Sequence, residues 1–271
     1  MRLLGIVASL RPEGNAELLT RLALATAAAA GAQADILLLR DLKLDFCQGC
    51  LACVYGQGCP RPDDTTWLFE TAAAYDALLL ASPVYWSGPP APVKTLVDRG
   101  VALFPALAGR RQRLVGTICV GAGPEGATGA FAGIPVLNEL AFLLGGRLAG
   151  TVAVRASWPG EALLDAEATR QVKELTLAVL QGRSLPAPAG QCPVCRLAPV
   201  PPAAVCPFCL YDPSRPEGEG RFTAASLTGH LHDWMHPSRE SFLAHRARVR
   251  EAKARHGAFS PRVVKPDVAG P

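Results

Sequence analysis

Two groups of cysteines are the residues in this chain whose spacing could do chemistry. The first group has the spacing C-x2-C-x2-C-x5-C, is followed by proline, and consists of Cys47, Cys50, Cys53 and Cys59. A tight run of thiolates that ends in proline is typical of iron–sulfur sites, whereas a tetrahedral zinc site usually takes two C-x-x-C pairs held apart by a longer loop. The spacing favours an iron–sulfur cluster. Zinc, a redox dithiol and unligated cysteines are the alternatives.

The second group forms two C-P-x-C pairs, and its members are Cys192, Cys195, Cys206 and Cys209. Each pair makes a knuckle whose backbone N–H groups face sulfur, and two such knuckles are the pattern of a zinc ribbon. Four thiolates complete a tetrahedral shell, so a zinc ion at this site would be structural. The sequence therefore predicts two separate metal sites.

The N-terminal apolar run is too short for a signal peptide, and Arg11 and Glu13 follow it at once. No run approaches the roughly 20 apolar residues that a membrane-spanning helix needs. We therefore expect a cytoplasmic protein with no membrane partner, in which thiols stay reduced and clustered cysteines bind metal rather than form disulfides. The net charge of +4 is mild, and we expect no nucleic-acid partner.

Apolar runs that alternate with helical patterns must position these residues. Hydrophobic residues make up 49% of the chain and charged residues 18%, which allows a large core. Continuous apolar strands suit a parallel sheet covered on both faces, and their alternation with helices predicts a doubly wound α/β fold. Strands are predicted over 3–8, 35–39, 77–81, 113–120 and 148–154. Helices are predicted over 16–31, from a cap at 63–65 to 74, and over 92–107, 130–144 and 161–182.

A polar loop follows the first strand, and it contains Ser9, Arg11, Gly14 and Asn15. A strand, a turn and a helix in succession aim helix N-terminal N–H groups at an anion, and the side chains of this loop add donors. An ordinary turn with a polar cap is the alternative.

Two further loops are expected at the same edge of the sheet. The segment 82–90 follows the third strand, and its Tyr85 and Trp86 are suited to line or stack on a flat ring. Alternatively, both aromatic side chains pack the loop against the next helix. The glycine-rich segment 121–129 follows the fourth strand and is a third ligand-facing loop.

Composition divides the chain into four parts: an α/β domain over 1–184 with the cysteine loop 47–59, a linker over 185–190, a zinc ribbon over 191–212, and a tail over 213–271. The tail carries three closely spaced histidines and a basic helical pattern over 238–256. Solvated or capping side chains are the favoured interpretation for the histidines, and metal binding is the alternative. For the basic pattern a solvated helix face is favoured, and a weak docking site for an acidic partner or nucleic acid comes second. The last residues, 257–271, are expected to be disordered.

The loop after strand one, the cysteine run after strand two and the Ser-Pro-Val-Tyr-Trp segment after strand three together resemble the NADPH-dependent FMN reductase family, and within it the iron–sulfur flavoproteins. The resemblance covers about residues 1–182. It implies a flavodoxin-like fold with a five-stranded parallel sheet, bound FMN and a 4Fe–4S cluster. The C-terminal ribbon and tail lie outside it.

The resemblance also implies roles for particular residues. It assigns the FMN phosphate to Ser9, Arg11, Gly14 and Asn15. It assigns the isoalloxazine ring to Ser82, Pro83, Val84, Tyr85 and Trp86, and further flavin contacts to Gly121, Gly123 and Gly126. It assigns the 4Fe–4S cluster to Cys47, Cys50, Cys53 and Cys59. The family's K-x-x-x-D-R helix pattern is matched by Lys94, Asp98 and Arg99.

One departure lies in the phosphate loop. Relatives usually carry Thr or Ser after the Asn, and this chain has Ala16. The loss of one charge-assisted hydrogen bond to phosphate costs roughly 1.5–3 kcal/mol. FMN is then expected to bind more weakly, or to exchange as a substrate.

We therefore predict an iron–sulfur flavoprotein that passes electrons between a reduced donor, either ferredoxin or NAD(P)H, and an acceptor. The family's relatives form dimers or tetramers, so the resemblance also implies a homo-oligomer. The first alternative is an NAD(P)H-dependent flavin or quinone reductase whose N-terminal cysteines bind zinc. The second is a non-enzymatic redox sensor that acts through the zinc ribbon.

Overall fold

The computed structural model describes residues 1–53, 57–86, 88–100, 113–122, 133–187, 191–192 and 247. The chain divides into two units, Met1–Leu227 and Thr228–Pro271, and every element named below belongs to the first. Predictions made for the tail 213–271, apart from residue 247, and for most of the zinc ribbon lie outside the described residues. The same holds for the predicted site residues Gly123, Gly126, Cys195, Cys206 and Cys209.

A parallel β-sheet carries the site. Within the described residues it has five strands in the order β2-β1-β3-β4-β5. Every residue of β4 is buried, as expected for a central strand that is covered on both faces. The chain reverses its direction of winding between β1 and β3, and at such a switch point open α/β sheets bind ligands. The strands are β1 Arg2–Val7, β2 Gln33–Leu38, β3 Ala77–Pro83, β4 Arg113–Gly121 and β5 Gly146–Arg155.

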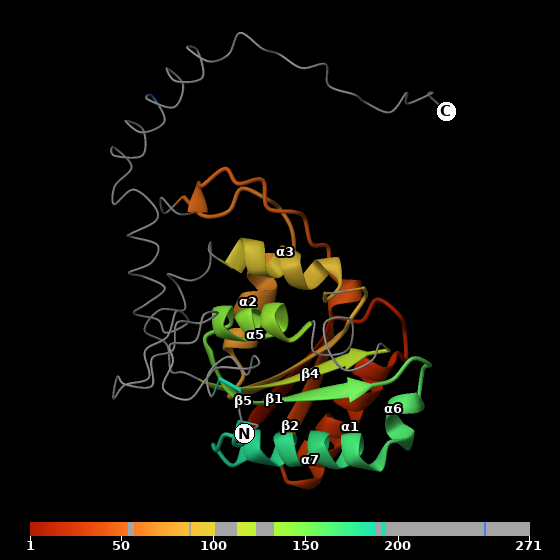
Figure 1. The fold of residues 1–271 in the computed structure, drawn as a ribbon. Helices are drawn as coiled ribbons and strands as arrows, with labels where there is room; N and C mark the ends of the chain where they lie inside the picture. The colour runs from red at the N-terminus through yellow and green to blue at the C-terminus, as the bar shows by residue number, and fades with distance from the viewer. Residues whose placement is uncertain are drawn as a thin grey trace. The chain divides into compact units, whose positions relative to one another are not determined.

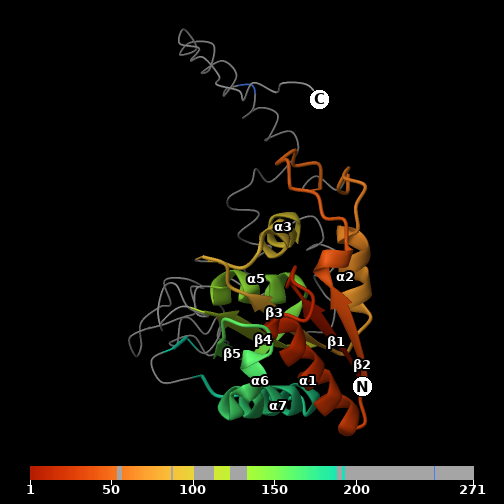
Figure 2. The ribbon, with the colours of Figure 1, turned by 90° about the vertical axis from the view of Figure 1, so that its right-hand side faces the viewer.

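Helices cover both faces of this sheet (Figure 1, Figure 2). One face carries α1 (Asn15–Ala29), α6 (Glu161–Leu164) and α7 (Ala166–Leu180). The other face carries α2 (Thr65–Ala73), α3 (Ala91–Gly100) and α5 (Ile134–Leu143). A short 3-10 turn, η1 (Leu39–Asp41), follows β2. In the part of the chain that is described, no helix is both long and apolar enough to span a membrane.

The core lies in the two layers between sheet and helices. Successive side chains of a strand point to opposite faces, so both faces of β3 take part. Leu79 packs in a buried cluster that includes Leu19 of α1 and Val172 of α7. Leu78 and Leu80, one residue to either side, are also fully buried. A sheet buried in this way holds the ends of its strands in fixed positions.

The expected doubly wound fold is confirmed, and the predicted strands are found with ends that differ by a few residues. One expected helix, 161–182, is instead two helices. The break is at Asp165, which has φ −81° and ψ 105° and whose side chain accepts hydrogen bonds from the backbone N–H groups of Glu167 and Ala168. Asp165 is therefore the N-cap of α7, a role in which Asp is strongly preferred.

Candidate cofactor cavity and cysteine loop

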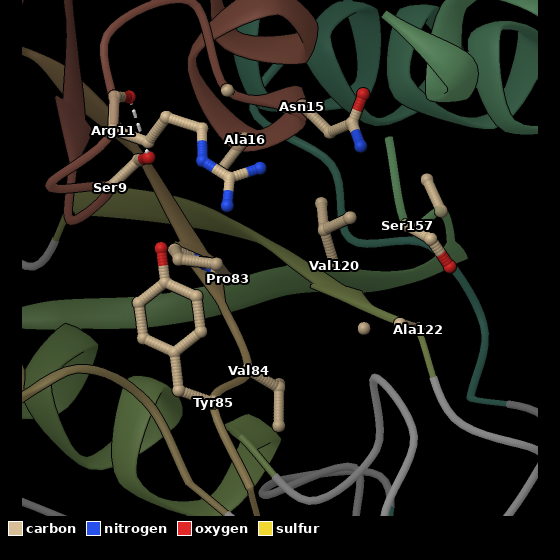
Figure 3. A pocket seen from close by; sticks show the side chains of 13 residues that line it. Ser9, Arg11, Asn15, Ala16, Pro83, Val84, Tyr85, Val120, Ala122 and Ser157 are labelled. Atoms are coloured by element: carbon tan, nitrogen blue, oxygen red, sulfur yellow. Dashed lines mark hydrogen bonds between the residues drawn. The ribbon is translucent and has the colours of Figure 1, made fainter. Parts of the chain in front are cut away.

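A cavity opens at the carboxyl edge of the sheet, where the loops after β1, β3, β4 and β5 meet (Figure 3). Residues predicted to contact FMN from three separate loops therefore share one site. The lining residues are Ser9, Arg11, Gly14, Asn15, Ala16, Pro83, Val84, Tyr85, Val120, Gly121, Ala122, Ala156 and Ser157.

The loop after β1 folds tightly around the carbonyl of Arg11. The Ser9 hydroxyl donates to this carbonyl at 2.9 Å, and the Gly14 N–H approaches it at 3.4 Å. A Cβ added to Gly14 would lie 2.8 Å from Ser9 Oγ, which is closer than real Cβ contacts come. The loop therefore needs glycine at this position to bring α1 up to the cavity.

The same end of the cavity has the chemistry of an anion site. The N-terminus of α1 lies here, and the first N–H groups of a helix have no partner within the helix. The Arg11 side chain extends into the cavity (Figure 3), and its guanidinium makes no ion pair within the described residues. Among the described lining residues Arg11 is the one cation, and none is a carboxylate. These residues fit a phosphate group.

The buried carboxylate of Glu17, on the first turn of α1, stabilises the loop after β1. Its side chain is 1% exposed, and it accepts hydrogen bonds from Arg40 and Arg21, both at 2.7 Å, and from the Glu13 N–H at 3.0 Å. Burial would by itself raise the pKa of Glu17, but these hydrogen bonds outweigh it and hold the pKa at about 2. Glu13 has a φ of 53°, which a non-glycine residue rarely adopts, so Glu17 fixes a strained part of the loop.

Asn15 lines the cavity, and its side-chain amide is held by three hydrogen bonds. The amide Nδ2 donates to the Trp158 carbonyl at 2.8 Å, and Oδ1 accepts from the N–H groups of Gly160 at 2.9 Å and Ala162 at 3.3 Å. These hydrogen bonds link α1 to the loop that precedes α6, and a contact of this side chain with phosphate stays a prediction. Trp158 is 143 positions from Asn15, and no local pattern indicates such a contact.

The loop after β3 supplies an apolar wall. Pro83, Val84 and Tyr85 line the cavity, and the Val84 N–H donates to the Val120 carbonyl at 2.7 Å, which fixes this loop to β4. Tyr85 and Gly88 exchange backbone hydrogen bonds of 2.8 and 3.3 Å and close a turn. Tyr85 is 44% exposed, so its ring is available to a flat ligand.

Two residues predicted to contact the ring lie outside the lining. Ser82 is fully buried, and its hydroxyl donates to the Pro83 carbonyl at 2.8 Å. Trp86 has a φ of 56° within the tight turn and is 95% exposed. In this structure Ser82 therefore supports the loop, and Trp86 faces solvent.

The fourth loop of the site was not predicted. Ala156 and Ser157 follow β5 and line the cavity, together with Val120 and Ala122 from the end of β4. The predicted strand order could have indicated these two residues, because β5 ends at the same edge of the sheet as β4. Ala156 and Ser157 are small and belong to no motif, so nothing else in the sequence indicated that they line the cavity.

The cysteine loop connects η1 to α2 and extends beyond α3, away from the sheet (Figure 1, Figure 2). Cys47 and Cys50 are exposed, and Cys53 and Cys59 are partly buried. Gly49 (φ 61°) and Gly58 (φ 70°) make the tight turns, and the Gly49 N–H approaches Cys47 Sγ at 3.4 Å. N–H groups that face sulfur are what a thiolate-held metal or cluster needs, so the donor set fits the predicted group.

The four thiols of the cysteine loop do not converge on a common point in the structure. Within the described residues, no group of three or more His, Cys, Asp or Glu side chains is placed to hold a metal ion. The ligand assignment of Cys47, Cys50, Cys53 and Cys59 therefore stays a prediction. The same applies to the zinc ribbon, because Cys192, which is fully buried, is the only one of its four cysteines among the described residues.

Two acidic residues close the base of the cysteine loop. We expected Asp63 and Asp64 to cap α2; Asp64 occupies the N-cap position but makes no side-chain cap. Its carboxylate instead accepts from the Lys43 N–H at 2.7 Å. Asp63 accepts from the Thr65 N–H at 3.2 Å and, across the loop, from the Asp45 N–H at 2.8 Å. The pair thus joins the two ends of the loop and does more than start a helix.

Comparison with known proteins assigns the family. Residues 1–151 match the model of the NADPH-dependent FMN reductase family. The chain belongs to this family. The match ends within β5 and includes three of the four loops that line the cavity, as well as the cysteine loop.

Curated relatives of the chain are named iron–sulfur flavoproteins. One from Methanocaldococcus jannaschii is 36% identical over 126 residues, which cover 46% of this chain and 65% of the relative. Another from Methanosarcina thermophila is 33% identical over 103 residues, which cover 38% of this chain and 54% of the relative. The chain thus spans about half to two thirds of the length of these relatives.

Solved structures agree on the fold. A flavone reductase matches with a TM-score of 0.69 at 16% identity, and the match covers 98% of this chain and 100% of that one. An NAD(P)H:quinone oxidoreductase from Methanothermobacter marburgensis matches with a TM-score of 0.50 at 17% identity, over 66% of this chain and 97% of that one. At such identities the likeness shows the flavodoxin-like fold alone, and the strand order β2-β1-β3-β4-β5 agrees with it.

Proposed function

We propose that this protein is an FMN-dependent oxidoreductase that passes electrons between a reduced donor and an acceptor through FMN and a 4Fe–4S cluster. The observation that carries the proposal is the cavity, which joins an anion site at the N-terminus of α1 to an apolar wall at the end of β3. Membership of the NADPH-dependent FMN reductase family and the names of the curated relatives support it.

Each end of the cavity suits one end of FMN. Arg11 and the first N–H groups of α1 would bind the phosphate, with the Ser9 hydroxyl, Gly14 and Glu17 holding the loop in place. The ring would lie against Val84 and Tyr85, beside the ends of β3 and β4. Bound FMN would accept a hydride or two single electrons.

The cysteine loop would hold the cluster through Cys47, Cys50, Cys53 and Cys59. A bound cluster carries one electron at a time, so the two groups together would convert two-electron into one-electron chemistry. The chain's own part is to turn N–H groups toward sulfur, as Gly49 does for Cys47, and to fix the base of the loop through Asp63. Ferredoxin or NAD(P)H as donor, and assembly into a homo-oligomer, belong to the same proposal.

Anaerobic purification followed by flavin, iron, sulfide and zinc analysis tests the proposal. The expected result is one FMN with about four irons and four sulfides per chain, plus one zinc if the C-terminal ribbon is real. Bound FMN with two zincs and no iron would replace the cluster by a structural zinc and favour the simple flavin or quinone reductase. Failure of the purified chain to bind FMN at all would reject the oxidoreductase.

A further inference from the structure

A buried ion pair lies under the cysteine loop. Arg99 sits in the last turn of α3 and Asp63 lies just before α2; their side chains are 2% and 0% exposed. Nη2 of Arg99 donates to Asp63 Oδ1 at 2.9 Å, and Nη1 donates to Oδ2 of the same carboxylate. This two-pronged pairing fixes the plane of the guanidinium.

The fixed guanidinium also contacts the cysteine loop at two points. Nη1 donates to the Asp45 carbonyl at 3.0 Å, and Nη2 approaches Cys59 Sγ at 3.4 Å. A guanidinium has two N–H bonds on each Nη, so Asp63, Asp45 and Cys59 together account for all four. Lysine offers three donors from one nitrogen and cannot reproduce this planar fork.

The hydrogen bond to Cys59 comes from a charged donor, whereas the one to Cys47 comes from a neutral donor. Cys47 receives a neutral backbone N–H from Gly49, whereas Cys59 faces a guanidinium that water does not reach. A charge-assisted hydrogen bond is stronger than a neutral one, and low solvent exposure reduces screening. If Arg99 served only to stabilise the fold through its ion pair with Asp63, its contact with Cys59 would not be required.

We propose that Arg99 is a positioning and tuning residue, and that its hydrogen bond to Cys59 raises the reduction potential of the cluster bound by the cysteine loop. This inference rests on the proposed function, because it requires a cluster at Cys59. Reduction adds one electron, supplied by reduced flavin or by an external reductant, and it breaks no bond. The added negative charge spreads onto the cysteine sulfurs, so a nearby desolvated cation stabilises the reduced state more than the oxidised state.

The backbone explains why α3 carries this residue. Helix α3 begins at Ala91, directly after the loop that gives Val84 and Tyr85 to the cavity, and its last turn brings Arg99 next to the cysteine loop. One helix therefore connects the cavity wall to the thiol ligand. Lys94 lies on the same helix but pairs with Asp98 on the exposed side, at 58% and 44% side-chain exposure.

The test is a redox titration of the full-length protein, purified anaerobically and monitored by the electron paramagnetic resonance signal of the reduced cluster. Arg99→Lys keeps the positive charge next to Asp63 but loses the planar pair of donor nitrogens that contact Asp63 and Cys59 together. The double variant Arg99→Gln, Asp63→Asn removes both charges together and so leaves no unpaired buried charge. Lys94→Gln is the matched control, because it removes one positive charge from the exposed side of the same helix.

In both Arg99 variants the reduction potential of the cluster is expected to fall by about 59 mV, which corresponds to an about tenfold smaller equilibrium constant for one-electron reduction. The control is expected to keep the wild-type potential. Wild-type potentials in both Arg99 variants, at full iron and sulfide content, would overturn the inference while leaving the proposed cluster intact. Wild-type protein without iron or sulfide would overturn the cluster itself and the role of Arg99 with it.

Discussion

The link between Asn15 and the loop before α6 gives the sharpest structural prediction. Replacing Asn15 by Ala removes one donated and two accepted hydrogen bonds. The Trp158 carbonyl keeps a hydrogen bond from the Glu161 N–H at 3.0 Å, whereas Ala162 is fully buried and its N–H would lose its partner. An unsatisfied buried group costs about 1–3 kcal/mol and a replaced hydrogen bond about 1 kcal/mol, which gives a total of about 2–4 kcal/mol.

Urea unfolding of the flavin-free protein measures this loss. Asn15→Asp is the comparison variant, because its carboxylate still accepts from Gly160 and Ala162 but places an acceptor oxygen, in place of the donor, against the Trp158 carbonyl. It should lose less free energy of unfolding than Asn15→Ala, because the buried Ala162 N–H keeps its partner. Equal losses in both variants, or an unchanged unfolding midpoint in Asn15→Ala, would refute the assignment of the amide to this link. Because Ser157 lines the cavity beside the link, Asn15→Ala should also weaken FMN binding.

Three further predictions concern the loop after β1. The pKa of Glu17 lies below its ordinary value of 4.5, at about 2, so its ion pairs stabilise the fold above pH 4.5 and this stability is lost as the pH falls toward 2. Acid unfolding curves should show a loss of up to about 3 kcal/mol across this window, and Glu17→Gln should lack it. Gly14→Ala should lower the free energy of unfolding by about 1–3 kcal/mol, as measured by urea titration, because its Cβ meets Ser9 Oγ at 2.8 Å. Ala16→Ser should tighten FMN binding by about tenfold in a fluorescence titration and leave riboflavin binding unchanged, because riboflavin has no phosphate to accept a hydrogen bond from the added hydroxyl.

Much of the fold follows from local sequence patterns. The strand 77–83 is apolar until its end, and burial on both faces of the sheet requires that composition. The sequence pattern missed the break at Asp165, because apolar spacing continues across it while the cap acts through backbone N–H groups. The helix period and the cap were in conflict there, and the cap determined the structure.

The candidate site was predictable where a motif lies on one loop. Ser9, Gly14 and Tyr85 follow strands directly, and strand order brings them to one edge. The amide of Asn15 and the contact of Arg99 with Cys59 were not predictable, because each partner is distant in sequence. Such contacts depend on how separate elements pack, and local sequence patterns do not indicate that packing.

The most direct test of the account compares FMN with riboflavin, which lacks the phosphate. Titrating both flavins into flavin-free wild-type protein and into Arg11→Ala measures what the anion site contributes. Loss of one charge-assisted contact, about 1.5–3 kcal/mol, should weaken FMN binding by at least tenfold in Arg11→Ala and leave riboflavin binding unchanged. Lys173→Ala, an exposed site on α7 outside the cavity lining, should bind both flavins as the wild type does. Equal FMN affinity in wild type and Arg11→Ala would contradict the phosphate site at the N-terminus of α1.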